Sequence, residues 1–212
     1  MKILAATKIL KANELLAEEN RRTWSAEGVF AVNVLGSPGC GKTTLLEALF
    51  AQLRDRIQPA VIEGDIAGSI DAERIDRLGI PVVQINTEGA CHLDANIVAA
   101  ASRQLDYRRV DTLVIENVGN LVCTAGFDLG EHLRMVLLSV SEGDDKIVKY
   151  PAIFQRSHVL VITKIDLLPY TDFRPDRVAG DMKRLNPEAA VFQVSALPVS
   201  YTHLTLPTIY SV

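Results

Sequence analysis

The sequence predicts an α/β domain of three layers, in which helices cover both faces of a mostly parallel central sheet of about seven strands. Three observations favour this fold class. Seven short, nearly continuous apolar runs follow residue 28, and such runs are typical of strands buried on both faces. Segments of helical spacing separate these runs, as in a chain that alternates strand and helix. A glycine-rich turn joins the first apolar run to the first helical segment after it.

The elements follow in chain order. Apolar residues spaced among lysines and glutamates predict an N-terminal helix over residues 2–20, within a segment 1–28 that packs on the domain. Strands are expected at residues 29–35, 60–62, 81–85, 112–115, 135–140, 159–162 and 190–194. Helices are expected between them, including residues 43–54, 71–78, 93–105 and 175–185. No internal repeat or low-complexity linker divides the chain, so residues 29–196 are predicted to form one domain.

Composition excludes several classes of protein. The 212 residues carry 22 basic and 26 acidic side chains, a net charge of -4, and no basic cluster. A protein that binds nucleic acid through a broad basic face is therefore excluded. The apolar runs are far shorter than the roughly 20 residues of a membrane span, and the N-terminus lacks the apolar stretch of a signal peptide. We expect a cytoplasmic protein with no nucleic-acid or membrane partner, whose three cysteines are free thiols or metal ligands.

The glycine-rich turn has the sequence GSPGCGKTT and fits G-x-x-x-x-G-K-[ST], between a predicted strand and a predicted helix. Such a loop wraps backbone amides around phosphates, as in P-loop NTPases. Lys42 is expected to bridge the β- and γ-phosphates, and Thr43 to offer its hydroxyl to Mg²⁺. The alternatives are an incidental glycine turn and, for Cys40, a small side chain packed among the amides. The predicted phosphate-binding residues are Gly36, Ser37, Gly39, Cys40, Gly41, Lys42, Thr43 and Thr44.

A second motif points to the base. The sixth apolar run ends in Thr163-Lys164-Ile165-Asp166, which resembles the N-K-x-D motif of GTPases. The Asp166 carboxylate can accept from both N1–H and the 2-amino group of guanine, a pair that adenine does not supply, and the Lys164 stem can cover the ring. Thr163 replaces the usual Asn, so one tethering hydrogen bond is weakened or remade through the hydroxyl. Ser195-Ala196 after the seventh run resembles the start of the S-A-K loop. Together these motifs predict GTP as the nucleotide.

Two acidic residues are candidates for Mg²⁺ binding and catalysis beside Lys42. Glu116 starts Glu116-Asn-Val-Gly119, which resembles the D-x-x-G switch, so it is expected to hold Mg²⁺ while the Gly119 amide senses the γ-phosphate. Asp65 follows the second run and is predicted to bind Mg²⁺ or to orient the attacking water; the alternative is a turn residue that caps residues 66–69. No glutamine stands where Ras-type enzymes position water, so unaided hydrolysis is expected to be slow.

Cys91, His92 and Cys123 follow the third and fourth runs and should open on the same edge of the sheet as the nucleotide. Two thiolates and an imidazole suit Ni²⁺ or Zn²⁺. Three ligands do not close a structural tetrahedron, which indicates a labile metal or a site shared across a dimer. The alternative is that these are ordinary loop cysteines, because no C-x-x-C pair is present.

In this order the motifs resemble the family of hydrogenase nickel-incorporation GTPases, HypB, of the SIMIBI class. The resemblance covers residues from about 9 to 196 and includes Lys149-Tyr-Pro151. It implies a GTPase that dimerises on GTP binding and helps deliver nickel to the large subunit of [NiFe] hydrogenase. It also implies that Cys91, His92 and Cys123 bind the metal at the dimer interface. A HypA-type nickel chaperone and the hydrogenase large-subunit precursor are the implied partners.

Two departures from this family are visible. Neither an N-terminal C-x-x-C-G-C motif nor a histidine-rich tract is present, so N-terminal nickel binding is not expected. Residues 197–212 match nothing in the family and contain no charged residue, so we hypothesise that this tail is not native. Two alternatives stay open. One is a urease-accessory GTPase, although its Cys-Pro-His metal motif does not occur here; the other is a P-loop kinase or nucleotide-binding regulator with incidental cysteines.

Overall fold

The computed structural model describes residues 6–66 and 68–196, and it confirms the predicted fold class. The seven expected strands form one sheet, in the order β3-β2-β4-β1-β5-β6-β7, and every pairing is parallel. The hypothesised non-native tail lies outside the described residues. The strands are β1 (Phe30–Gly36), β2 (Pro59–Asp65), β3 (Val82–Asn86), β4 (Thr112–Glu116), β5 (Leu133–Ser139), β6 (Val159–Thr163) and β7 (Ala190–Gln193).

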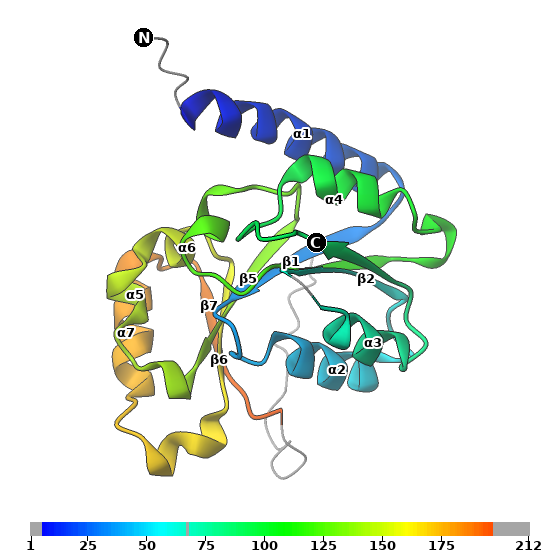
Figure 1. The fold of residues 1–212 in the computed structure, drawn as a ribbon. Helices are drawn as coiled ribbons and strands as arrows, with labels where there is room; N and C mark the ends of the chain where they lie inside the picture. The colour runs from blue at the N-terminus through cyan, green and yellow to red at the C-terminus, as the bar shows by residue number, and fades with distance from the viewer. Residues whose placement is uncertain (1–5, 67, 197–212) are drawn as a thin grey trace.

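Helices cover both faces of this sheet, as Figure 1 shows. One face carries α2 and α3, whose buried side chains pack with Val34, Val61 and Val114 of the strands. The opposite face carries α4 beside β2 and β4, and α5, α6 and α7 beside β5 and β6. The helices are α1 (Ala6–Ala26), α2 (Lys42–Leu53), α3 (Ile70–Asp76), α4 (Ala95–Ser102), α5 (Lys146–Lys149), α6 (Pro151–Gln155) and α7 (Pro175–Leu185).

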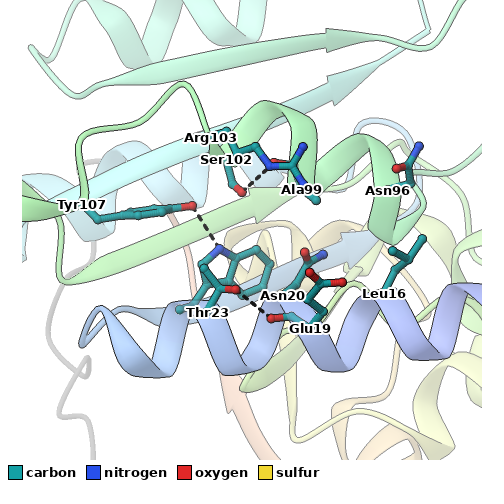
Figure 2. Close-up of a pocket in the computed structure, with 10 residues that line it drawn as sticks. Leu16, Glu19, Asn20, Thr23, Asn96, Ala99, Ser102, Arg103 and Tyr107 are labelled. Atoms are coloured by element: carbon teal, nitrogen blue, oxygen red, sulfur yellow. Dashed lines mark hydrogen bonds between the residues drawn. The ribbon is translucent and has the colours of Figure 1, made fainter.

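The N-terminal helix packs on the domain across α4, on the upper side of Figure 1. Trp24 is buried and its Nε1 donates to the Tyr107 hydroxyl (3.1 Å). Asn20 Nδ2 donates to the carbonyls of Ala95 (2.9 Å) and Leu129 (3.0 Å). A cavity of about 80 Å³ remains between the two helices (Figure 2). The residues that line this cavity include none of the predicted nucleotide-binding residues, so the packing of α1 on α4 has a structural role.

The observed boundaries differ from the predicted ones in a few places. Helix α1 extends to Ala26 instead of ending at residue 20, because Trp24 continues its apolar face into the core. The short helices α5 and α6 were not predicted, since four and five residues are too few to show a helical period. Among the described residues, no helix has both the length and the apolar character needed to cross a membrane.

Candidate nucleotide and metal sites

The phosphate loop lies between β1 and α2, at the carboxyl end of the sheet. Gly39 (φ 72°) and Gly41 (φ 96°) both have left-handed backbone conformations, which only glycine adopts without strain. Helix α2 begins directly after Gly41, so its N-terminal amides point toward the loop. Lys42 and Thr43, the first two residues of α2, are buried. The loop therefore has the backbone geometry that the motif predicts for binding phosphates.

Cys40 is a packing residue within this loop. Its side chain is fully buried, and burial raises the pKa of the thiol to about 11. A Cβ atom on Gly36 would lie 2.6 Å from the Cys40 sulfur, so the thiol fills space that any other residue at position 36 would need. Cys40 is thus neutral at physiological pH, as expected for a small side chain among the phosphate-binding amides.

The predicted base motif contacts the phosphate loop directly. The Thr163 hydroxyl donates to the Cys40 carbonyl (2.7 Å), and Lys164 Nζ donates to the Gly39 carbonyl (2.7 Å). The Ser195 hydroxyl donates to Asp166 Oδ1 (2.5 Å). Lys164 has a left-handed conformation (φ 58°) that turns its stem back over the loop. The tether that Asn makes in the usual motif is therefore remade through the Thr163 hydroxyl.

Three carboxylates meet beside Thr43. The Thr43 hydroxyl donates to Glu116 Oε1 (2.8 Å). One oxygen each from Glu63, Asp71 and Glu116 lies within 4.8 Å of the others, the only such group of three or more potential metal ligands in the described chain. Glu63 and Glu116 are register partners on the neighbouring strands β2 and β4, which brings their side chains together.

Of the three carboxylates, the sequence patterns predicted only Glu116 as a Mg²⁺ ligand; Glu63 and Asp71 were not predicted. Glu63 precedes Asp65 by two residues, so alternation along a strand predicts that their side chains share a face. Asp71 lies at the start of α3, and no pattern in the sequence places its side chain beside Glu116. Asp65 lies outside the cluster. Its Oδ1 accepts from the Ile66 amide (2.7 Å), as a turn residue does.

Burial and mutual repulsion change the acidity of this cluster. The pKa of Glu63 is raised to about 8 by burial and by the charge of Glu116, and burial raises the pKa of Glu116 to about 7. One oxygen of each carboxylate, Oε2, is buried without a hydrogen-bond partner. Buried, unpartnered carboxylate oxygens beside a hydroxyl are the donors that Mg²⁺ prefers. The cluster therefore fits Mg²⁺ at the position where phosphates would meet Thr43.

Arg74 of α3 holds this side of the site together. Its guanidinium donates to the Thr44 hydroxyl (3.0 Å), to Asp71 (3.0 Å) and to Glu47 (2.5 Å). Arg74 thus links Asp71, a member of the carboxylate cluster, to Thr44 and Glu47 of α2. Arg74 was not predicted as a site residue, because its local sequence pattern is the same as that of an exposed arginine on a helix.

The segment that follows Glu116 touches the phosphate loop. A Cβ atom on Gly119 would lie 2.8 Å from both the nitrogen and the Cα of Pro38. The Asn120 amide donates to the Gly36 carbonyl (3.0 Å). The main chain of the Gly119 segment therefore lies directly against the phosphate loop.

The predicted metal ligands lie near one another without forming a single compact cluster. Cys91 Sγ lies 3.7 Å from His92 Nδ1, and the neighbouring Cys91 thiol raises the pKa of Cys123. All three side chains are partly exposed. The His92 ring stacks on Phe127, with ring centroids 3.9 Å apart. In the described part of the chain, the three ligand atoms do not all come within 4.8 Å of one another.

Comparisons with known proteins agree with this geometry. The family model for "CobW/HypB/UreG, nucleotide-binding domain" matches residues 30–193. A probable hydrogenase maturation factor HypB from Methanocaldococcus jannaschii is 45% identical over 190 residues, covering 90% of this chain and 86% of the relative. Hydrogenase maturation factor HypB from Rhizobium leguminosarum is 47% identical over 188 residues, covering 89% of this chain and 63% of the relative. This chain therefore spans less than two thirds of the latter protein.

The fold and site define a P-loop nucleotide-binding protein in which two cysteines and a histidine lie near one another apart from the phosphate loop. The chain belongs to the CobW/HypB/UreG family. Within that family it groups with the HypB proteins. The crystal structure of HypB from Helicobacter pylori in complex with nickel aligns with a TM-score of 0.84 at 41% identity, over 87% of each chain.

Proposed function

We propose that this chain is a GTP-hydrolysing nickel carrier that assists hydrogenase maturation and dimerises when it binds GTP. The observation that carries the proposal is the contact between the guanine-type motif and the phosphate loop. Thr163 and Lys164 bind the loop's own carbonyls, at Cys40 and Gly39. A base bound by Asp166 would therefore have its phosphates over the amides that follow Gly39.

In this proposal the nucleotide is bound from three sides. The amides of residues 36–44 bind the phosphates, Lys42 neutralises the β- and γ-phosphate charge, and Asp166 accepts from guanine. When Mg²⁺ is bound, it supplies positive charge to the phosphate oxygens. Thr43 and Glu116 hold that cation, with Glu63 and Asp71 completing the acidic wall around it.

Water activation is assigned to the end of β2. We propose that Asp65, the last residue of β2, orients the attacking water, since it lies outside the carboxylate cluster that fits Mg²⁺. The Gly119 amide is proposed to sense the γ-phosphate, because Gly119 already packs against Pro38. No residue of this set replaces a dedicated water-positioning glutamine, so slow turnover is expected.

Nickel is the proposed cargo, and Cys91, His92 and Cys123 are its proposed ligands. The support is chemical: two thiols and an imidazole lie close together and partly exposed, and such ligands suit Ni²⁺ or Zn²⁺. The solved HypB of Helicobacter pylori is a nickel complex. Because three ligands leave the metal open, we propose that a second copy of the chain completes the site in the GTP-bound dimer. A HypA-type chaperone and a hydrogenase precursor are the proposed donor and acceptor.

A nucleotide-binding experiment tests the first half of this proposal. In Asp166→Asn, the amide can donate to the 2-oxo group of xanthine but no longer accepts twice from guanine. We expect GTP affinity to fall by about 10- to 100-fold, the usual loss for charge-assisted hydrogen bonds, and xanthosine triphosphate affinity to rise. Unchanged GTP selectivity would instead favour the alternative of a P-loop kinase or regulator with incidental cysteines.

The urease-accessory alternative is less well supported. The family model covers HypB and UreG alike and does not separate them. The sequence lacks the Cys-Pro-His motif of the urease-accessory proteins, and the relatives at 45% and 47% identity are HypB proteins. We therefore retain hydrogenase maturation as the proposed role.

A further inference from the structure

Four polar side chains are buried between the central strands and the helices on the α4 side, where apolar packing would be the default. The exposed fractions of the whole residues are 0% for Asn33, 1% for Asn117, 6% for Glu131 and 3% for Arg134. Asn117 Nδ2 donates to Asn33 Oδ1 (3.4 Å), and Asn33 Nδ2 donates to Glu131 Oε1 (3.3 Å). Glu131 pairs with Arg134 at 2.6 Å. We refer to these four residues as the buried polar network.

One end of the network lies under the proposed nickel ligands. Arg134 donates to the carbonyls of Ala125 (3.4 Å) and Phe127 (2.9 Å), in the short segment that begins at Cys123. Phe127 in turn stacks on the His92 ring. The position of the Cys123 segment and the orientation of His92 therefore both depend on Arg134.

The other end lies between the nickel loop and the nucleotide switch. Asn117 Oδ1 accepts from the Leu93 amide (3.3 Å) and from the Val118 amide (3.0 Å). Leu93 follows His92 directly, and Val118 precedes Gly119, which packs on Pro38 of the phosphate loop. A single buried amide side chain thus joins the two segments.

The alternation of side chains along a strand explains why Asn117 can contact the nickel loop while its neighbour Glu116 contacts the nucleotide site. Val114 packs with α2 and α3, whereas Ile115 packs with α4. Continuing that alternation, Glu116 faces Thr43 on the α2 side and Asn117 faces Asn33 and Leu93 on the α4 side. Two consecutive residues at the end of β4 therefore contact the nucleotide site and the nickel loop, on opposite faces of the sheet.

We propose that Asn117 is the positioning residue that couples the nucleotide state to the nickel ligands. When the γ-phosphate displaces the Glu116–Gly119 segment, the Asn117 side chain moves with its own main chain and shifts the Leu93 amide, and hence His92. Arg134 keeps the Cys123 segment fixed, so the geometry between His92 and Cys123 changes. This inference rests on the proposed function and assigns the coupling to one side chain.

The test compares nickel affinity with GDP and with a non-hydrolysable GTP analogue, and takes the ratio of the two. Coupled sites usually change each other's affinity by about 5- to 150-fold, so the parent should give a ratio of at least about fivefold. Asn117→Ala should bring the ratio to within about twofold of one. Asn186→Ala is the matched control. It removes a side-chain amide that donates to the Phe154 and Ser157 carbonyls and bonds to neither the phosphate loop nor the proposed nickel ligands, and it should keep the parent ratio at a lowered melting temperature.

A parent ratio of one contradicts the proposed function itself. A parent ratio that survives in Asn117→Ala overturns only the role of Asn117. Equal loss of the ratio in both variants also overturns that role, because the effect is then general destabilisation.

Hydrogen exchange in the parent provides a second measurement if Asn117→Ala does not fold. The exchange rate of the Leu93 amide should differ between the GDP and analogue states by at least about fivefold. Equal rates, in a parent whose nickel affinity depends on nucleotide, would overturn the inference.

Discussion

At the scale of single residues, the base motif shows how a substitution can preserve a contact. Thr163 stands where GTPases usually have Asn, and the motif alone left open whether the tether is lost or remade. The Thr163 hydroxyl donates to the Cys40 carbonyl at 2.7 Å, and Thr163 is buried. The connection between base loop and phosphate loop is therefore kept by a shorter side chain.

Removing this hydroxyl should weaken nucleotide binding. Thr163→Ala leaves the buried Cys40 carbonyl without its side-chain donor, and such losses cost about 1–3 kcal/mol. We expect GDP affinity to fall about 5- to 100-fold and the melting temperature of the nucleotide-free protein to decrease. Fluorescent GDP titration measures the first effect. Thr163→Ser keeps the hydroxyl and should stay close to the parent; an equal loss in Thr163→Ser would show that the methyl group, not the hydrogen bond, matters.

The acidic cluster makes stability depend on pH and on Mg²⁺. The pKa of Glu63 is raised to about 8 and that of Glu116 to about 7, so the folded protein holds protons that the unfolded chain releases. Raising the pH from about 5 to about 8 therefore lowers the free energy of unfolding of the metal-free protein. Mg²⁺ bound at the proposed site would replace these protons and is expected to remove the decline.

Thermal melts in EDTA and in Mg²⁺ across this pH range measure the effect. Glu63→Gln cannot ionise and should flatten the decline in EDTA. A melting temperature in EDTA that rises from pH 5 to pH 8 in the parent, and equally in Glu63→Gln, would contradict the assignment.

At the scale of elements, the sequence patterns predicted the seven strands because each is a short apolar run between glycine, charged or polar residues. They did not predict Glu63 and Asp71 as partners of Glu116. Alternation along β2 was a signal for Glu63, but its pairing with Glu116 depends on strand register. The position of Asp71 depends on the path of the chain into α3, which no local period encodes. The buried polar network was missed for a related reason. Asn33 and Arg134 lie within strands whose other residues are nearly all apolar. Only the packed structure shows that both side chains bond to Glu131.

The Gly119 segment should depend on having no side chain. A Cβ at this position would lie 2.8 Å from the Pro38 main chain, so Gly119→Ala forces the switch segment away from the phosphate loop. We expect GTP hydrolysis to fall at least about tenfold, since positioning of groups at the phosphate carries much of such catalysis. Phosphate release measures this. Gly180→Ala, within α7, is the control and should retain activity, because a Cβ there would meet only Arg184 Nη1 at 3.8 Å, an ordinary contact; equal losses in both would refute the role of Gly119.

The Glu131–Arg134 pair should stabilise the segment that carries Cys123. Both side chains are 4% exposed, and removing one partner of such a buried pair usually costs about 3–5 kcal/mol. Arg134→Met should lower the free energy of unfolding by this amount in urea denaturation, and Arg134→Met with Glu131→Leu should recover part of the loss. A loss below about 1 kcal/mol in the single variant, the level of an exposed pair, would contradict this role.

At the scale of the whole molecule, the nucleotide site and the proposed metal site share the carboxyl edge of one parallel sheet. The phosphate loop lies on the α2 side, and the loop of the proposed ligands Cys91 and His92 lies on the α4 side. Glu116, the last residue of β4, contacts Thr43 on the first side, and Asn117, which follows it, contacts Leu93 on the second. An enzyme that only hydrolyses GTP has no need of the second site, and a simple metal carrier has no need of the first. The arrangement is suited to a protein in which hydrolysis controls metal release.

The most direct test of this account is nickel binding measured with GDP and with a non-hydrolysable GTP analogue, together with the oligomeric state in each. We predict an affinity that differs at least about fivefold between the two states, and a shift to the dimer with the analogue. Nickel binding, and with it the difference in nickel affinity between the two states, should be lost in Cys91→Ala and Cys123→Ala, which keep the nucleotide loops intact. Equal nickel affinity and stoichiometry in both nucleotide states would contradict the account.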